Sequence, residues 1–509
     1  MTSAVSTECY RDVWSDPVMQ RLVSRSIAGM EALAEESSNR FNMTRNGYLF
    51  LTSSESDPVA SVPRHWEVRS HQEADTYAPN NRSSSRRAAA QRQADAACAF
   101  LENPTGMDVL DAKQLTREFP FLFRGTTTPP AGDGGGGLGV AYGVHARRCG
   151  WLDAQQYGAF LLDQAKGAGL DTLIGYEVCG VELGTDSSVR RVRIDGVDGH
   201  GTGPMVLDTP VLVNAAGPFC RAVDDLLPPE IPSPLDALGV DNTLHAKVIL
   251  PDPLEVIPKH SPMIIAADPV KIPWEEAEGL EELAESSGEF FEALGPSWKG
   301  LLSEYLPAGA HVRPSTGGGW LVFVWEHAHS HLKASTTLAG GPNESTGSDG
   351  GGCEFREALL SPQMPGFYER LVTSRLDDLY PEMVIRALST VIPSLEPYVD
   401  GTTGMKGVSM DGGYYTSTKD SRPVVGPHAS VHGYHYICGF AGYGLMASYA
   451  AAEIVGIHVT RQSSGVAAED LNNDDVIKSL APPGFLGLKR GAEDIPRSHG
   501  SVSGIGGSL

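Results

Sequence analysis

The hydrophobic pattern near the C-terminal end of the chain predicts two strands followed by a helix. Residues Arg422–Pro427 and Tyr434–Phe440 are rich in Val, Tyr, Ile and Phe and are bounded by Gly and Pro, which is typical of strands. The next stretch, from about Leu445 to Ile457, is small or apolar on nearly every side apart from Glu453. A helix without a polar face is usually a buried helix, so we expect this one to lie in the core.

The second of these strands passes into the helix through a turn that is spaced by Gly439, Gly442 and Gly444. A strand that turns directly into a helix leaves the first backbone N–H groups of the helix without intrahelical partners. Together with the positive end of the helix dipole, these groups suit an anionic oxygen or a phosphate. The alternative is an ordinary strand–turn–helix unit in an α/β core.

Continuous and alternating apolar runs divide the rest of the chain. Val211–Val213 is continuously apolar, whereas Thr243–Leu250 alternates, and His311–Arg313 and Trp320–Trp325 should form a hairpin. Continuous runs are typical of parallel sheets that are covered on both faces. We therefore predict that the strands at Val211 and Tyr434 share one sheet, and that the other strands belong to a separate antiparallel sheet.

The remaining elements are predicted from periodicity and from start and stop signals. They are helices from Asp16 to about Ser37, Ala154–Lys166, Trp274–Glu285, Phe367–Leu379 and Pro381–Leu388, and strands Phe41–Thr52 and Thr172–Leu183. Residues Gly132–Gly137 formally satisfy G-x-G-x-x-G, but the sequence TTTPPA precedes them instead of a strand. We predict that Gly132–Gly139 is an exposed irregular loop.

Composition and charge exclude several classes of protein. The chain has 509 residues with a formal net charge of −24, which argues against a nucleic-acid-binding surface. Its seven cysteines form no C-x-x-C pair, so neither a zinc site nor a disulfide framework is expected. No membrane span and no apolar signal core are apparent. These features predict a cytoplasmic protein, or an organellar one if the true N-terminus lies further upstream.

Several motifs together resemble the FAD-dependent oxidoreductases related to D-amino-acid oxidase, sarcosine oxidase and dimethylglycine dehydrogenase. The motifs are Ser6–Arg11, the R-x-G-Y strand at Arg45–Tyr48, G-W-L-D at Gly150–Asp153, N-A-A-G at Asn214–Gly217, and the closing glycine-spaced turn and helix. The resemblance implies an α/β fold. It would comprise a discontinuous Rossmann-like FAD-binding domain and an α+β substrate domain with a large antiparallel sheet.

The resemblance also implies a division of the chain into domains. The FAD-binding domain would comprise residues 1–38, 144–228 and 401–462. The substrate domain would comprise residues 39–143, with an irregular insertion at 57–103, and residues 229–400. Residues 463–509 would be a polar, partly disordered tail. The strand–GxGxxG–helix unit that opens this family is missing from the sequence, so we expect the chain to bind FAD weakly or not at all.

Candidate site residues follow from the resemblance. The cofactor-binding candidates are Ser6, Thr7, Val178, Ala215, Ala216, Gly217, Gly442, Tyr443, Gly444, Leu445 and Met446. The catalytic candidates are Arg11, His245, Tyr414 and Tyr415, with Lys247 and His311 as weaker ones. Arg11 would neutralise a flavin or substrate carboxylate by a bidentate contact. Family members usually carry His at the position of Tyr443. Some attach FAD through a Cys at the position where this chain has Gly412 and Gly413, so we expect FAD to bind non-covalently.

The resemblance predicts an enzyme that oxidises a C–N bond of an amino acid or of a secondary or N-methyl amine, by hydride transfer to the flavin. Two alternatives remain open. One is a family descendant without FAD that acts as a binding or assembly protein, and the other is an FAD enzyme that acts on a 2-hydroxy acid. A flavin spectrum distinguishes a protein without FAD from an FAD enzyme. A panel of amines assayed by dye reduction distinguishes an amine-oxidising enzyme from one that acts on 2-hydroxy acids.

Overall fold

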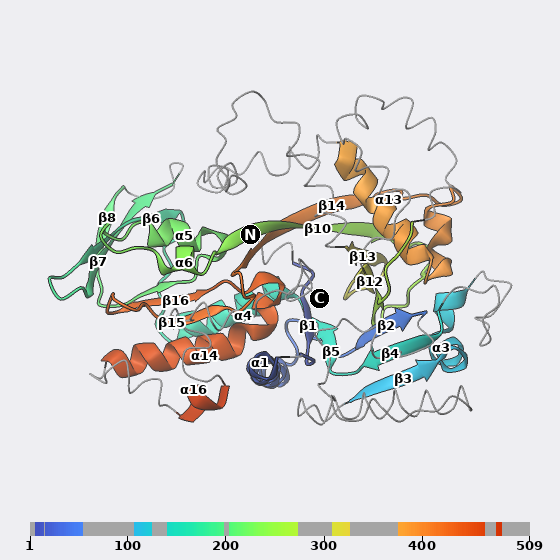
Figure 1. Ribbon diagram of the computed structural model, residues 1–509, viewed down its shortest axis with the longest axis horizontal. Coiled ribbons are helices and arrows are strands. Elements are labelled where there is room, and N and C mark those ends of the chain that lie inside the picture. The colour runs from blue at the N-terminus through green and yellow to red at the C-terminus, as the bar shows by residue number, and fades with distance from the viewer. Residues whose placement is uncertain are drawn as a thin grey trace, which may run out of the picture.

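The computed structural model describes residues 6–14, 16–53, 106–124, 140–197, 203–272, 308–325, 375–463 and 475–480. These residues form two lobes, which the long strands β10 and β14 connect (Figure 1). The larger sheet, which we call the roof, has eight strands. In sheet order they are β14 (Ser409–Ser417), β10 (Asp241–Pro251), β13 (Trp320–Val324), β12 (His311–Pro314), β11 (Met263–Ala266), β2 (Tyr48–Thr52), β4 (Tyr142–Ala146) and β3 (Met107–Asp111).

Every pairing in the roof is antiparallel except that of β11 with β2. Beneath it, β1 (Cys9–Arg11) pairs with β5 (Cys149–Trp151) as a two-stranded ribbon. Two three-stranded sheets build the other lobe. They are β15 (Val424–Pro427), β16 (Tyr434–Cys438) and β9 (Leu212–Asn214), and β6 (Tyr176–Leu183), β7 (Val189–Gly196) and β8 (Met205–Asp208).

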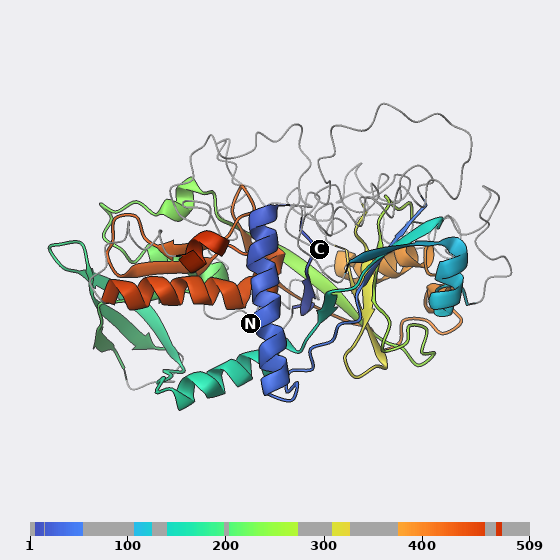
Figure 2. The same ribbon diagram turned by 90° about the horizontal axis from the view of Figure 1, so that it is seen from below.

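The long helix α1 (Pro17–Glu36) stands between the lobes, and the long helix α14 (Gly444–Ser463), in the lobe of β15 and β16, crosses it (Figure 2). Asp16 caps α1 because its side chain accepts bonds from the N–H groups of Val18 and Met19. The shorter helices are α3 (Ala112–Glu118), α4 (Ala154–Gly167), α5 (Cys220–Asp224), α6 (Pro234–Ala237), α13 (Arg375–Ser389) and α16 (Asp475–Leu480). The 3₁₀ turns are η3 (Pro120–Phe123), η4 (Gly217–Phe219), η7 (Pro393–Tyr398) and η8 (Ala441–Tyr443).

The sheet arrangement predicted from hydrophobic patterns is confirmed. β9 pairs in parallel with β16, whereas β10 pairs antiparallel with β13 in the roof. Gly433 allows the parallel pair to form, because it has a φ of +84° and a Cβ there would lie 2.1 Å from the Pro210 carbonyl oxygen. The predicted hairpin of β12 and β13 is also present.

Two predicted strands begin later than expected. Only Tyr48–Thr52 of the predicted strand Phe41–Thr52 is extended in a sheet, since Asn42 and Gly47 have positive φ angles of 50° and 86°. These angles turn the chain, which bonds instead to β5 through the N–H groups of Thr44 and Gly47. β6 begins at Tyr176 instead of Thr172.

Some predictions fall on residues outside the described ranges. They are the loop Gly132–Gly139, the whole insertion at 57–103, the helix Trp274–Glu285 and the first part of Phe367–Leu379. Within the ranges that the structure describes, no helix has both the length and the apolar character that a membrane span requires.

Candidate active site

Three parts of the fold meet beneath the roof: the segment that runs into β1, the start of α14, and one face of the roof. β1 lies against α14 on one side and pairs with β5 on the other. β1 and α14 come together because β1 leads into α1 along the chain, and α1 packs across α14. The Ser26 hydroxyl of α1 accepts a bond of 2.9 Å from the N–H of Ala450 in α14.

Alternation along β10 and β14 places the polar side chains of the roof on its lower face. His245 and Lys247 lie two residues apart in β10, and their cross-strand partners are Gly413 and Asp411. Lys247 Nζ lies 3.3 Å from Asp411 Oδ1 and donates to the Ser6 carbonyl oxygen at 3.2 Å. This face therefore carries a charged pair that also holds the segment before β1.

The aromatic candidates of β14 are separated by the same alternation. The Tyr415 ring stacks on His245 with ring centroids 3.7 Å apart, so the two form one polar–aromatic unit. Tyr414 is the next residue and therefore lies on the opposite face of the roof. The structure thus brings Tyr415 and His245 together and does not bring Tyr414 to them.

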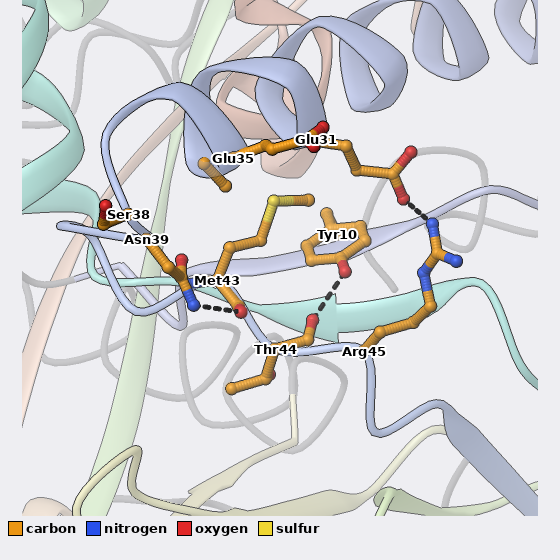
Figure 3. A pocket seen from close by; sticks show the side chains of 9 residues that line it. Tyr10, Glu31, Glu35, Ser38, Asn39, Met43, Thr44 and Arg45 are labelled. Carbon is orange, nitrogen blue, oxygen red and sulfur yellow. Dashed lines mark hydrogen bonds and ion pairs between the residues drawn. The ribbon is translucent and has the colours of Figure 1, made fainter.

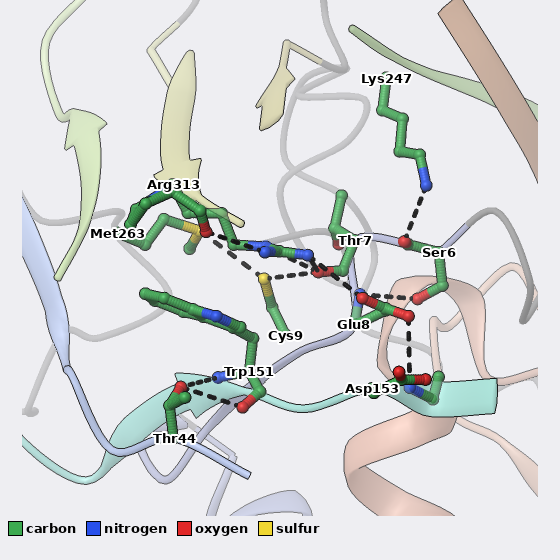
Figure 4. A network of polar contacts seen from close by, with 12 residues as sticks. Ser6, Thr7, Glu8, Cys9, Thr44, Trp151, Asp153, Lys247, Met263 and Arg313 are labelled. Atoms are coloured by element: carbon green, nitrogen blue, oxygen red, sulfur yellow. Dashed lines mark hydrogen bonds and ion pairs between the residues drawn. The ribbon is translucent and has the colours of Figure 1, made fainter. Parts of the chain in front are cut away.

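Arg313 of β12 fixes the segment before β1 from the other side (Figure 4). Its Nε and Nη2 donate to the Thr7 carbonyl oxygen at 3.0 and 2.8 Å, and Nη2 lies 3.4 Å from Glu8 Oε2. The guanidinium also lies over the Trp151 ring, 5.3 Å from its centroid. Together with Lys247, Arg313 holds Ser6 and Thr7 at fixed positions under the roof.

Glu8 joins this network to a helix. Its Oε1 accepts a bond of 3.2 Å from the N–H of Ala154, the first residue of α4. Burial raises the pKa of Glu8, and the positive charge of Arg313 opposes that rise. Burial likewise raises the pKa of Asp411 against the charge of Lys247. The site therefore contains two partly buried carboxyl groups, each beside one cation.

Arg11 and Tyr443 are linked through Trp14, a residue that sequence reasoning missed. The Arg11 side chain is fully buried, and its guanidinium carbon lies 4.5 Å from the centroid of the Trp14 ring. Trp14 in turn packs edge-on against Tyr443 at 5.2 Å between centroids. Tyr443 donates to the Ser421 carbonyl oxygen at 2.6 Å. A large aromatic residue three positions after Arg11 was the only sequence signal for this contact.

The start of α14 is the candidate for binding the flavin end of FAD. η8 runs directly into α14, and Phe440 before it offers no side-chain cap. The N–H groups around Gly442, Gly444 and Leu445 would therefore be available to an anionic oxygen. Met446 and Tyr443 are buried and anchor this turn in the core between α1 and α14.

The N-A-A-G turn is attached to the end of the roof. Ala215 and Ala216 lead into η4, whose Pro218 carbonyl oxygen accepts a bond of 3.0 Å from Asn242 Nδ2. Gly217 has a φ of +57°, a conformation that favours glycine. Val178 lies elsewhere, in the separate sheet of β6, β7 and β8, where it pairs with Ile194.

Glu8, Arg313 and Asp411 were also missed by sequence reasoning. In the sequence, Glu8 and Asp411 stand beside residues of the candidate motifs. Arg313 lies in a strand of the kind whose polar side chains are usually solvated. The alternation of β10 and β12 could have pointed to Arg313, because it places His311 and Arg313 on one face. His311 is buried, and its Nδ1 lies 2.8 Å from the Gly309 carbonyl oxygen.

Comparison with known proteins supplies a family and a fold. The family model for FAD dependent oxidoreductases matches residues 2–265, just over half of the chain. No curated protein matches the sequence. Among solved structures, L-proline dehydrogenase from P. horikoshii has a TM-score of 0.50 at 15% identity, covering 92% of this chain and 85% of that one.

Two further structures are similar to this one. Iminodiacetate oxidase from Chelativorans sp. BNC1 has a TM-score of 0.51 at 15% identity, covering 92% of this chain and 87% of that one. L-α-glycerophosphate oxidase from Mycoplasma pneumoniae, solved with FAD bound, has a TM-score of 0.50 at 12% identity, covering 90% of this chain and 85% of that one. These likenesses concern the fold.

Proposed function

The chain belongs to the FAD-dependent oxidoreductase family, and from that premise we propose that it oxidises a C–N bond of an amino acid or of a secondary or N-methyl amine. When bound, FAD would supply the acceptor for a hydride, which carries the two electrons of the oxidation, and the imine product would then hydrolyse. Similar structures named for proline and iminodiacetate support this substrate class, since both compounds are carboxylated amines.

The observation that carries the proposal is the position of Arg11. It is fully buried, stacked on Trp14 and next to the helix start that suits the flavin. A guanidinium can hold a substrate carboxylate by two parallel bonds, which would orient the adjacent carbon. The stacked pair of His245 and Tyr415 would line the opposite side of the substrate.

The test combines a spectrum, a substrate panel and one variant. Because we expect weak FAD binding, the assays contain excess FAD. Under these conditions we expect the spectrum of bound flavin, and dye reduction with amino acids or N-methyl amines but not with 2-hydroxy acids. Arg11→Lys keeps the charge but loses the bidentate geometry, so KM for carboxylated amines should rise by about tenfold or more, with the flavin spectrum retained. Dye reduction by 2-hydroxy acids alone would refute the proposal.

A further inference from the structure

A pocket of about 460 Å³ opens at the C-terminal end of α1 (Figure 3). It lies behind the candidate active site, because Tyr10 of β1 lines it while the neighbouring Cys9 and Arg11 point to the other face of the strand. Its volume is within the range of about 300–1,000 Å³ that small-molecule sites usually have.

The lining of this pocket combines an apolar floor with charges of both signs. The half-buried Met43 side chain forms the floor, and the Tyr10 ring, which is buried, borders it. Glu31 and Glu35 lie four residues apart on one face of α1 and form the upper edge. Arg45 stands at one side, where it is ion-paired to Glu31. A ligand here would meet a carboxylate, a guanidinium and an apolar surface at once.

A chain of charged contacts fixes the side of the pocket that carries Arg45. Glu31 is shared between Arg45 and Arg148, whose Nη2 lies 2.7 Å from Glu31 Oε2. Arg148 Nη1 lies 2.6 Å from Oδ2 of Asp12, which is buried. The Tyr10 hydroxyl donates to the Thr44 carbonyl oxygen at 2.5 Å. These contacts already hold the groups in place, so ligand binding would cost little conformational entropy to arrange them.

Two of the charges remain able to bind a ligand. Among the residues that the structure describes, none forms an ion pair or hydrogen bond with the Glu35 carboxylate. Arg45 is about half exposed, with 49% of its side-chain surface accessible. A guanidinium presents five donors, so Arg45 can bind a second carboxylate beside Glu31.

We propose that this pocket binds an apolar α-amino acid in its zwitterionic form. The ammonium group would contact Glu35, the carboxylate would contact Arg45, and the side chain would lie on Met43. Both charges of the ligand are thereby matched, and an apolar side chain covers the apolar floor. The site is distinct from the one beneath the roof and does not depend on the oxidation reaction.

The test uses Met43 as a local reporter. L-Leucine is titrated into the full chain, whose 12 methionines carry ¹³C-labelled methyl groups, and the Met43 signal is identified with Met43→Leu. We expect this signal to shift with L-leucine. Two half-ligands, 3-methylbutylamine and 4-methylpentanoate, each lack one charge and should bind about three- to fivefold more weakly, the range for partly exposed ion pairs.

Charge variants then assign each half of the ligand. Glu35→Gln should weaken L-leucine and the amine about three- to fivefold and leave 4-methylpentanoate unchanged. Arg45→Met should have the converse effect. Glu36→Gln is the matched control, because Glu36 is exposed on the same helix and does not line the pocket.

Two results would overturn the proposal. One is a Met43 signal that does not move with L-leucine, and the other is equal affinity in the Glu35→Gln and Glu36→Gln variants. Arg45→Met removes a partner of Glu31 and requires a check of folding, whereas Glu35→Gln breaks no contact among the described residues. Since the readout needs no turnover, failure here would leave the oxidation proposal untouched.

Discussion

Glu8 has a backbone φ of +62°, a left-handed conformation in which a side chain is strained by about 1–2 kcal/mol. Its carboxylate compensates by contacting Arg313 and the N–H of Ala154, and the N–H of Glu8 itself donates to Ser6 Oγ at 2.8 Å. Strained residues that are held by several contacts are concentrated at functional sites. Glu8 thus fixes the course of the chain between Thr7 and Arg11. This segment carries Arg11 of the candidate active site and Tyr10 of the proposed amino-acid pocket.

Replacement of Glu8 by Ala and by Gly separates the strain from the contacts. Both variants lose the carboxylate, but only Glu8→Gly relieves the positive φ. We therefore expect Glu8→Gly to be more stable than Glu8→Ala by about 1 kcal/mol in urea unfolding, against the usual preference for Ala over Gly.

The control for Glu8 is the same pair of substitutions at Glu182 in β6. Its φ is not among the positive ones, so Ala should be the more stable replacement there. A Glu8→Ala variant as stable as Glu8→Gly would show that residue 8 is not held in the left-handed conformation.

At the scale of elements, α1 and α14 cross at a glycine. A Cβ on Gly29 would lie 2.5 Å from the Tyr449 ring of α14, whereas a Cβ on Gly158 of α4 would meet nothing within 4 Å. Gly29 therefore allows the close approach of the two helices that position β1 and the turn at Gly442–Leu445.

Alanine substitutions at the two glycines should have opposite effects. Gly158→Ala should stabilise the protein by up to about 1 kcal/mol, the helix-propensity difference. Gly29→Ala gains the same propensity but has to displace Tyr449, so we expect a net loss of about 1 kcal/mol or more. Unfolding midpoints measure both, and equal stabilisation by the two variants would mean that α1 and α14 are less closely packed.

The elements that sequence predicted well are those with strong local signals. The Asp16–Pro17 cap located the start of α1, and hydrophobic patterns assigned β9 and β16 to one sheet and β10 and β13 to another. The strand predicted from Phe41 failed in its first half because chain turns at Asn42 and Gly47 depend on contacts with β5. Local periodicity contains no information on such contacts.

The candidate site could be predicted only in part, for a related reason. Motifs indicated the glycine-spaced turn and Arg11 as candidates, because each lies within the sequence motif that points to it. Trp14, Arg313 and Asp411 matter because tertiary packing brings them to the segment before β1. Arg313 and Thr7 are 306 positions apart in the sequence. No local pattern reports a contact over that distance.

At the scale of the whole molecule, buried histidines should make stability depend on pH. His428 is 7% exposed, and its Nδ1 accepts bonds of 3.0 Å from the N–H groups of Ser430 and Val431. Its ring stacks on Tyr436 at 5.9 Å, and burial lowers its pKa against the charge of Asp224. Burial also lowers the pKa of His145. Protonation of Nδ1 would remove the acceptor for both N–H groups.

A lowered histidine pKa means that the unfolded chain binds more protons than the folded one. The resulting stability is present above the ordinary pKa of 6.5 and is lost as pH falls through that value toward the folded-state pKa. The raised carboxyl pKa values of Glu8 and Asp411 act with the opposite sign, since the folded state holds those protons more tightly. A variant comparison is therefore needed to isolate the histidine contribution.

His428→Asn isolates it, because the Asn side-chain oxygen can accept the same two N–H bonds and does not titrate. We expect the wild-type protein to lose stability in urea unfolding as pH falls below about 7, and the variant to lose less. His260→Asn changes an exposed histidine and should leave the wild-type pH dependence intact. If His428→Asn and His260→Asn show the same pH dependence, His428 does not couple protonation to folding, and His145 or another group would have to account for the loss.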